Sequence, residues 1–77
     1  MANIINKEHN SNTTWYTLRG VDDGTRVHFD NEVVGITQEG NVVDSEGYPL
    51  SSQGDRLAIA VRNTLRADED AVKAIYY

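Results

Sequence analysis

The chain contains no cysteine and a single proline among its 77 residues. Without cysteine it can form no disulfide, no thiolate zinc site and no catalytic thiol. No apolar run approaches the roughly 20 residues that a membrane span requires, and the N-terminal segment lacks the apolar stretch of a secretory signal. These absences lead us to expect a cytoplasmic protein, in a bacterium or in the host cell of a virus, with no membrane partner.

Positive charge is also scarce, because seven basic residues stand against twelve acidic ones and leave a net charge of −5. The acidic excess lies in residues 1–54, which hold eight acids and three bases, whereas residues 55–77 hold four of each. Proteins that bind duplex DNA need a basic footprint that neutralises phosphates. The overall charge therefore argues against a general DNA-binding role.

The sequence has none of the motifs of common active sites. It shows no nucleophile elbow, no phosphate-cradling loop and no dinucleotide fingerprint. Carboxylates occur in several turns without the ligand spacing of a calcium loop, and two isolated histidines, His9 and His28, do not make a zinc site. We therefore expect no catalysis, no cofactor and no bound metal.

The first half of the chain has the pattern of an antiparallel β-meander. Residues 1–12 are polar and predict a loose arm or a short edge strand. Residues 14–50 hold short segments of alternating apolar and polar residues, separated by turns, one of them at 30–32. The expected strands cover 14–19, 25–30, 33–38 and 41–44. Their alternation places Tyr16 and Leu18 together and indicates one covered face and one solvated face.

Residues 52–76 have the pattern of a helix. From Asp55 onward the chain has neither Gly nor Pro, and its apolar positions recur at spacings of three and four, which is one helical face. Ser52 and Asp55 are the best placed N-caps. The expected fold is α+β, with three or four antiparallel strands followed by a C-terminal helix packed across one face, in a single domain over residues 1–77.

Asp68 interrupts the apolar stripe of this helix and leaves two alternatives open. In the first, the helix ends near Ala67 and Asp68 caps a short second helix from Glu69 to Tyr76, where an acidic first turn suits the helix dipole. In the second, the helix continues and Asp68 meets an arginine across an interface, where a buried polar residue can fix the register. Replacing Asp68 with Leu distinguishes them, because a loss of stability favours the cap.

The helix also carries more apolar surface than one sheet face can cover. A strip of alanines beside the aliphatic stripe would permit close approach of a helix from a second copy, and a domain this small gains stability from association. We therefore predict a non-catalytic, homodimeric protein-binding module of regulatory or accessory kind, compatible with a phage- or mobile-element-encoded inhibitor of a host protein. The predicted interface residues are Ala60, Arg62, Arg66, Ala67, Asp68, Ala71, Ala74, Ile75, Tyr76 and Tyr77.

The alternative function is binding of single-stranded nucleic acid through the strands. Aromatic and basic residues on neighbouring strands can form a stacking platform. That surface would consist of Trp15, Arg19, Arg26 and His28. The simpler interpretation is that the aromatic residues of these strands pack under the helix, because the core of so small a domain needs them.

Overall fold

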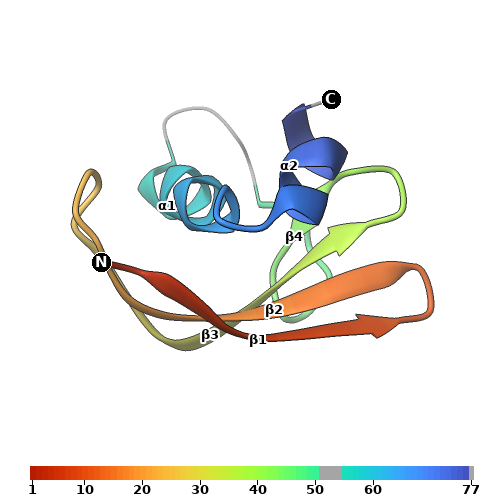
Figure 1. The fold of residues 1–77 in the computed structure, drawn as a ribbon, viewed down its shortest axis with the longest axis horizontal. Coiled ribbons are helices and arrows are strands. Elements are labelled where there is room, and N and C mark those ends of the chain that lie inside the picture. Colours follow the sequence, from red (N-terminus) through yellow and green to blue (C-terminus); the bar gives the residue numbers. More distant parts are fainter. Residues whose placement is uncertain (51–54, 77) are drawn as a thin grey trace.

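The computed structural model describes residues 1–50 and 55–76, with side chains as far as Ile75. One antiparallel sheet with the strand order β1-β2-β3-β4 is followed by two helices, and Figure 1 shows both helices on the same face of the sheet. The prediction of an α+β fold, with three or four antiparallel strands followed by a C-terminal helical region, is thereby confirmed. The proposed N-cap Ser52 and the interface residue Tyr77 lie outside the described residues, as does the side chain of Tyr76.

The elements follow one another with short connections. The strands are β1 (Asn3–Asn10), β2 (Thr13–Asp22), β3 (Val27–Thr37) and β4 (Val42–Val43), and the helices are α1 (Arg56–Leu65) and α2 (Glu69–Tyr76). Hairpin connections join the consecutive strands, which pair as neighbours, so the sheet is an up-and-down meander. Neither described helix has the length and hydropathy of a membrane span.

Residues 1–12 form the edge strand rather than the loose arm. β1 pairs with β2 from Asn3 opposite Arg19 to Asn10 opposite Thr13, with one irregularity between Ile4 and Asn6. Nearly all of its side chains are exposed, so the segment has no apolar pattern of its own. The β2 ladder and contacts with the helices keep it extended, and neither can be read from the segment itself.

The predicted turn at residues 30–32 is wrong, because β3 runs through it without reversing. Leu18 pairs with Glu32 and Gly20 pairs with Phe29, so that one residue of β2 faces two residues of β3. This is a β-bulge. Two positive φ angles accommodate it, 55° at Asn31 and 109° at Gly20, since both residue types tolerate left-handed backbone.

The core lies between the covered face of the sheet and the helices. The alternation in β2 and β3 is as predicted, since Tyr16 and Leu18 point inward together and are almost fully buried. The buried cluster consists of Tyr16, Leu18, Phe29, Val34, Ile36, Val42, Ala60, Val61, Leu65 and Ala71. Burial of these side chains, at about 25 cal/mol for each Å² of apolar surface, is the main force holding the helices on the sheet.

The other face of the sheet has no helix over it (Figure 1). Trp15 is half-buried there, because its ring lies across Gly35 of the neighbouring strand. A Cβ at that glycine would come within 2.7 Å of the Trp15 ring atom Cζ3. Gly35 thus provides the space in which the ring lies flat against the sheet.

Candidate functional site

Asp68 stands at the junction between the two helices and caps the second one. α1 ends at Leu65, and the Asp68 carboxylate accepts a hydrogen bond of 3.0 Å from the backbone N–H of Asp70 in the first turn of α2. This is the first of the two alternatives that the sequence left open. An aspartate at this position compensates for a backbone donor that the start of a helix leaves unpaired.

The same carboxylate attaches the helices to the edge strand. Lys7 Nζ lies 2.9 Å from an Asp68 oxygen and 3.0 Å from an Asp70 oxygen, and it lies 5.8 Å from the centroid of the Tyr16 ring. The Tyr16 hydroxyl donates a further hydrogen bond to Asp68. The partner of Asp68 is therefore a lysine of its own chain, and an interfacial arginine is not needed to neutralise it.

These contacts shift the titration of the groups involved. Burial alone would raise the pKa of Asp68, but the Lys7 ammonium, the Asp70 amide and the Tyr16 hydroxyl outweigh it and lower that pKa. The hydrogen bonds to Asp68 and Asp70 raise the pKa of Lys7. Burial, followed by the hydrogen bond to Asp68, raises the pKa of Tyr16 to about 12. At neutral pH Asp68 is therefore ionised, Lys7 is an ammonium and Tyr16 is a neutral phenol, and their contacts join the edge strand to the second helix.

The alanine strip does not form one surface. Ala60 and Ala71 are 0% and 1% exposed and belong to the core, whereas Ala67 and Ala74 are exposed on different elements. The prediction of this strip assumed a helix that continues through Asp68. The break there turns α2 away from the axis of α1 (Figure 1). Ala60 and Ala71 are thus inaccessible to a partner. Ile75 is only partly buried and packs against the core.

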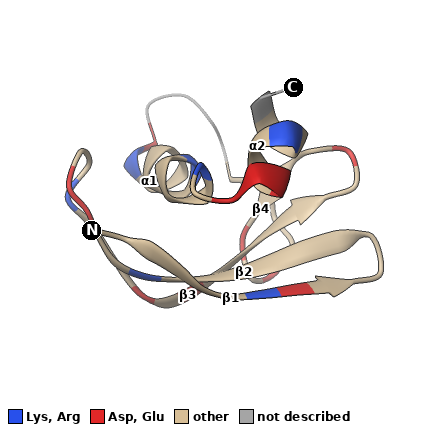
Figure 2. Cartoon of the chain, in the orientation of Figure 1, with Lys and Arg blue, Asp and Glu red and all other residues tan. Residues whose placement is uncertain are grey.

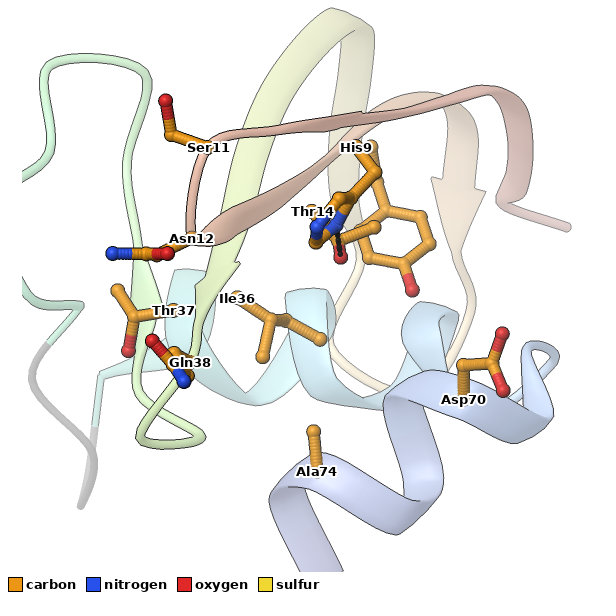
Figure 3. A pocket seen from close by; sticks show the side chains of 10 residues that line it. His9, Ser11, Asn12, Thr14, Ile36, Thr37, Gln38, Asp70 and Ala74 are labelled. Atoms are coloured by element: carbon orange, nitrogen blue, oxygen red, sulfur yellow. Dashed lines mark hydrogen bonds between the residues drawn. The ribbon is translucent and has the colours of Figure 1, made fainter.

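A shallow hollow of about 250 Å³ lies beside the Lys7 cluster, where α2 leaves the end of the sheet uncovered. Figure 3 shows Asp70 and Ala74 of α2 on one side and His9 and Thr14 of the β1–β2 hairpin on the other. His9 Nδ1 and the Thr14 hydroxyl are 3.0 Å apart and are hydrogen-bonded to each other.

The predicted nucleic-acid surface is dispersed. Arg26 lies in the turn between β2 and β3 with φ of 58°, about seven strand residues, or roughly 23 Å, from Trp15 at the rise of an extended chain. Arg19 is exposed four residues along β2 from Trp15. The strand neighbour of Trp15 in β1 is Glu8, whose carboxylate would repel a phosphate. His28 is exposed on β3.

The outward side of α1 is the most distinctive surface of the molecule. At about 100° per residue, its buried side consists of small and aliphatic residues, and the opposite side consists of five others, which we call the α1 outer face. These are Arg56, Ile59, Arg62, Asn63 and Arg66. The face holds three arginines and no carboxylate, in a protein whose net charge is −5. Figure 2 shows basic residues on α1 and acidic residues at the start of α2.

The members of the α1 outer face are positioned in different ways. Ile59 is 39% exposed, although the helix is otherwise apolar only on its core side. Arg56 donates a hydrogen bond to the backbone carbonyl of Thr25, which attaches the start of α1 to the β2–β3 turn. Asn63 donates to Asp22 at 3.4 Å. Among the side chains that the structure describes, none forms an ion pair or hydrogen bond with the half-buried Arg62 guanidinium.

Two features of this site were not recognised from the sequence. Arg62 and Arg66 were predicted interface residues, but Ile59 between them was not, although a helical wheel of α1 alone would have found it. Lys7 was missed because it lies in a polar segment with no pattern.

Among the described residues, no three side chains of the metal-binding types come together. Comparison of the chain with protein-family models, curated proteins and solved structures finds no match.

Proposed function

We propose that this protein is a non-catalytic protein-binding module and that the α1 outer face is its binding surface. The observation that carries the proposal is Ile59, which is 39% exposed among three arginines on a side of the helix that has no acidic residue of its own. An exposed apolar side chain alone is ordinary. Its combination with arginine is characteristic of protein interfaces, where arginine is enriched and apolar side chains fill pockets of the partner.

The rigidity of α1 supports the same proposal. Its N-cap Asp55 accepts from the Leu57 backbone N–H at 3.0 Å, and Ala58, Val61 and Leu65 are buried against the sheet. A helix held at its start and along its length presents its outer side chains in a fixed arrangement. Binding by such a surface costs little conformational entropy.

Two other predictions remain open beside this one. A homodimer stays a prediction, now without the alanine strip, and a symmetric contact of two α1 outer faces would oppose arginine to arginine. Single-stranded nucleic acid on the strand surface is less well supported, because Glu8 faces Trp15 in the β1–β2 register and Arg26 is remote. The origin of the chain, and inhibition as the outcome of binding, are also still predictions.

A random-peptide display selection against the folded protein tests the proposed function. Peptides that bind it should lose affinity when Ile59 is replaced by Asp, which keeps an exposed residue at that position but reverses its polarity. The matched control is Tyr48→Asp, since Tyr48 is 63% exposed in the loop after β4 and does not belong to the α1 outer face. Binding that responds to Tyr48→Asp and not to Ile59→Asp would contradict the proposal.

A further inference from the structure

We infer that the partner recognised by the α1 outer face is a protein segment that presents carboxylates next to an apolar side chain. This inference rests on the proposed function and specifies its partner class. It follows from charge complementarity, since the three arginines of residues 56–66 occur without a single acidic residue in that stretch. The remainder of the chain is strongly acidic, so this helix is the one long segment that would attract an acidic partner.

The spacing on the helix defines the complementary pattern. Arg62 and Arg66 are four residues apart and therefore lie roughly 5–6 Å from each other on one side of the helix. Each guanidinium can hold a carboxylate through two parallel hydrogen bonds. Ile59 lies one turn before Arg62 on the same side. The partner should thus offer an apolar pocket or side chain about one helical turn from a pair of carboxylates.

The length of the surface favours an acidic protein segment over a nucleic acid. α1 has ten residues and is therefore about 15 Å long at the rise of an α-helix. Carboxylates flank it at both ends, with Asp55 before the helix and Asp68 and Glu69 after it. Asp22 lies alongside and accepts from Asn63. A phosphate backbone that extended beyond the helix would meet these carboxylates, whereas a compact acidic segment would not.

Arg56 contributes less to recognition of the partner than the other residues of the α1 outer face. Arg56 already donates to the Thr25 carbonyl, so its contribution is mainly to the position of the helix. The residues that should discriminate between partners are Ile59, Arg62 and Arg66. Arg62 contributes the most, because no ion pair or hydrogen bond joins its guanidinium to the described side chains, so a partner carboxylate would compete with no such interaction among them.

The test is a pair of random-peptide display selections, one against the wild-type protein and one against the Arg62→Glu/Arg66→Glu variant. The wild type should enrich peptides rich in Asp and Glu with an aliphatic or aromatic residue, and the variant should enrich basic peptides. The affinity of a wild-type-selected peptide should fall roughly 10- to 100-fold for the variant, the effect of losing two close charge pairs. It should also fall as salt rises from about 50 mM to about 300 mM.

Three controls keep the outcomes distinct. Arg62→Gln/Arg66→Gln removes the charges with a smaller perturbation of the helix end, and it should give an intermediate loss of affinity. Lys73→Glu reverses an exposed charge on α2 and should leave the affinity within about twofold, the range of exposed positions outside a binding surface. Circular dichroism of each variant establishes that it is folded.

Each remaining outcome contradicts a stated part of the inference. Peptides of neutral composition that respond to Ile59→Asp but not to the arginine variants would overturn the acidic partner class and leave the proposed function intact. Peptides that respond to neither set of variants would overturn both. A single-stranded oligonucleotide that binds the wild type more tightly than any selected peptide, with loss in the arginine variants, would replace the protein partner with a nucleic acid.

Discussion

Replacing Asp68 with Leu should destabilise the protein substantially, although it places an aliphatic residue in an otherwise apolar stripe. The Asp68 side chain is only 16% exposed and serves three groups, which are the Asp70 N–H, the Lys7 ammonium and the Tyr16 hydroxyl. Leucine would satisfy none of them. A stable Asp68→Leu variant would mean that these contacts are incidental.

The magnitude follows from the exposure of each partner. Loss of the N-cap costs about 1 kcal/mol. Leaving the hydroxyl of Tyr16, which is 1% exposed, without its acceptor costs about 1–3 kcal/mol. The Lys7 side chain is 39% exposed and can return to water, so the ion pair adds about 1 kcal/mol at most. Because one side chain makes all three contacts they are not additive, and we expect a total loss of about 2–4 kcal/mol.

Asp68→Asn is the matched control, since asparagine is also a good N-cap and keeps an oxygen acceptor for Tyr16. It removes only the charge and should cost about 1 kcal/mol or less. Urea denaturation followed by circular dichroism and by the fluorescence of the single tryptophan measures both variants. With a slope of about 1 kcal/mol per molar urea for a domain this small, Asp68→Leu should lower the midpoint by about 2 M or more.

Acid titration gives an independent measurement of how much the contacts of Asp68 stabilise the protein. The pKa of Asp68 is lowered in the folded protein, since the three partners overcome the effect of burial. Its stabilisation is therefore present above the unfolded pKa near about 4 and is lost as the pH falls through the lower folded pKa. The difference in stability between wild type and Asp68→Asn should shrink over that interval. Equal losses for Asp68→Leu and Asp68→Asn, or a difference that is independent of pH, would refute this reasoning.

Other substitutions test the packing and the titration of the core in the same assays. Gly35→Ala should cost about 1–3 kcal/mol of stability and shift the tryptophan emission, because its Cβ would lie 2.7 Å from a ring atom of Trp15. The control Gly24→Ala, whose Cβ would lie 3.8 Å from its nearest neighbour, should change stability by about 0.5 kcal/mol or less. Equal effects of the two variants would contradict the packing of Trp15 on Gly35. Ala60→Leu should cost about 1–3 kcal/mol as an overpacked core position, whereas Ala67→Leu on the surface should be nearly neutral, and the reverse order would restore the alanine strip as a surface. Tyr16 has a folded pKa of about 12, so its stabilisation is present below the unfolded pKa near about 10 and is lost as the pH rises toward 12. Tyr16→Phe should reduce that alkaline dependence in urea titrations and leave the part that comes from Lys7, whose pKa is also raised. A dependence unchanged from wild type would contradict the buried hydrogen bond.

The features that local pattern dictates were predictable from the sequence. Alternation in β2 placed Tyr16 and Leu18 on the same face of the sheet, because the side-chain period of a strand is two. The helix break at Asp68 was one of two alternatives, because aspartate is equally compatible with a cap and with a polar interface position. The structure distinguishes them through Lys7, a residue far away in the chain, which no local pattern around Asp68 contains.

The features that depend on tertiary contacts were not predictable. β1 has no apolar alternation because its role at the sheet edge requires only backbone pairing and one inward ammonium. The prediction that the alanines form one surface was wrong for a geometric reason. A helical wheel is valid only while the helix axis is continuous, and the change of direction at Asp68 separates Ala60 from Ala74. The same wheel applied to α1 alone would have identified the outer face with Ile59 at its centre.

The ion pairs of Lys7 with Asp68 and Asp70 have a consequence for the order in which the protein folds during its synthesis. Lys7 and Asp70 are 63 positions apart, so the edge strand cannot acquire its ion pairs until the chain has been synthesised and released from the ribosome as far as α2. A contact of this sequence separation forms slowly, because the loop between its ends must close first. Of the strands of this sheet, the one made first is therefore among the last to be held in place, and its β1–β2 hairpin lacks these ion pairs until α2 has been made.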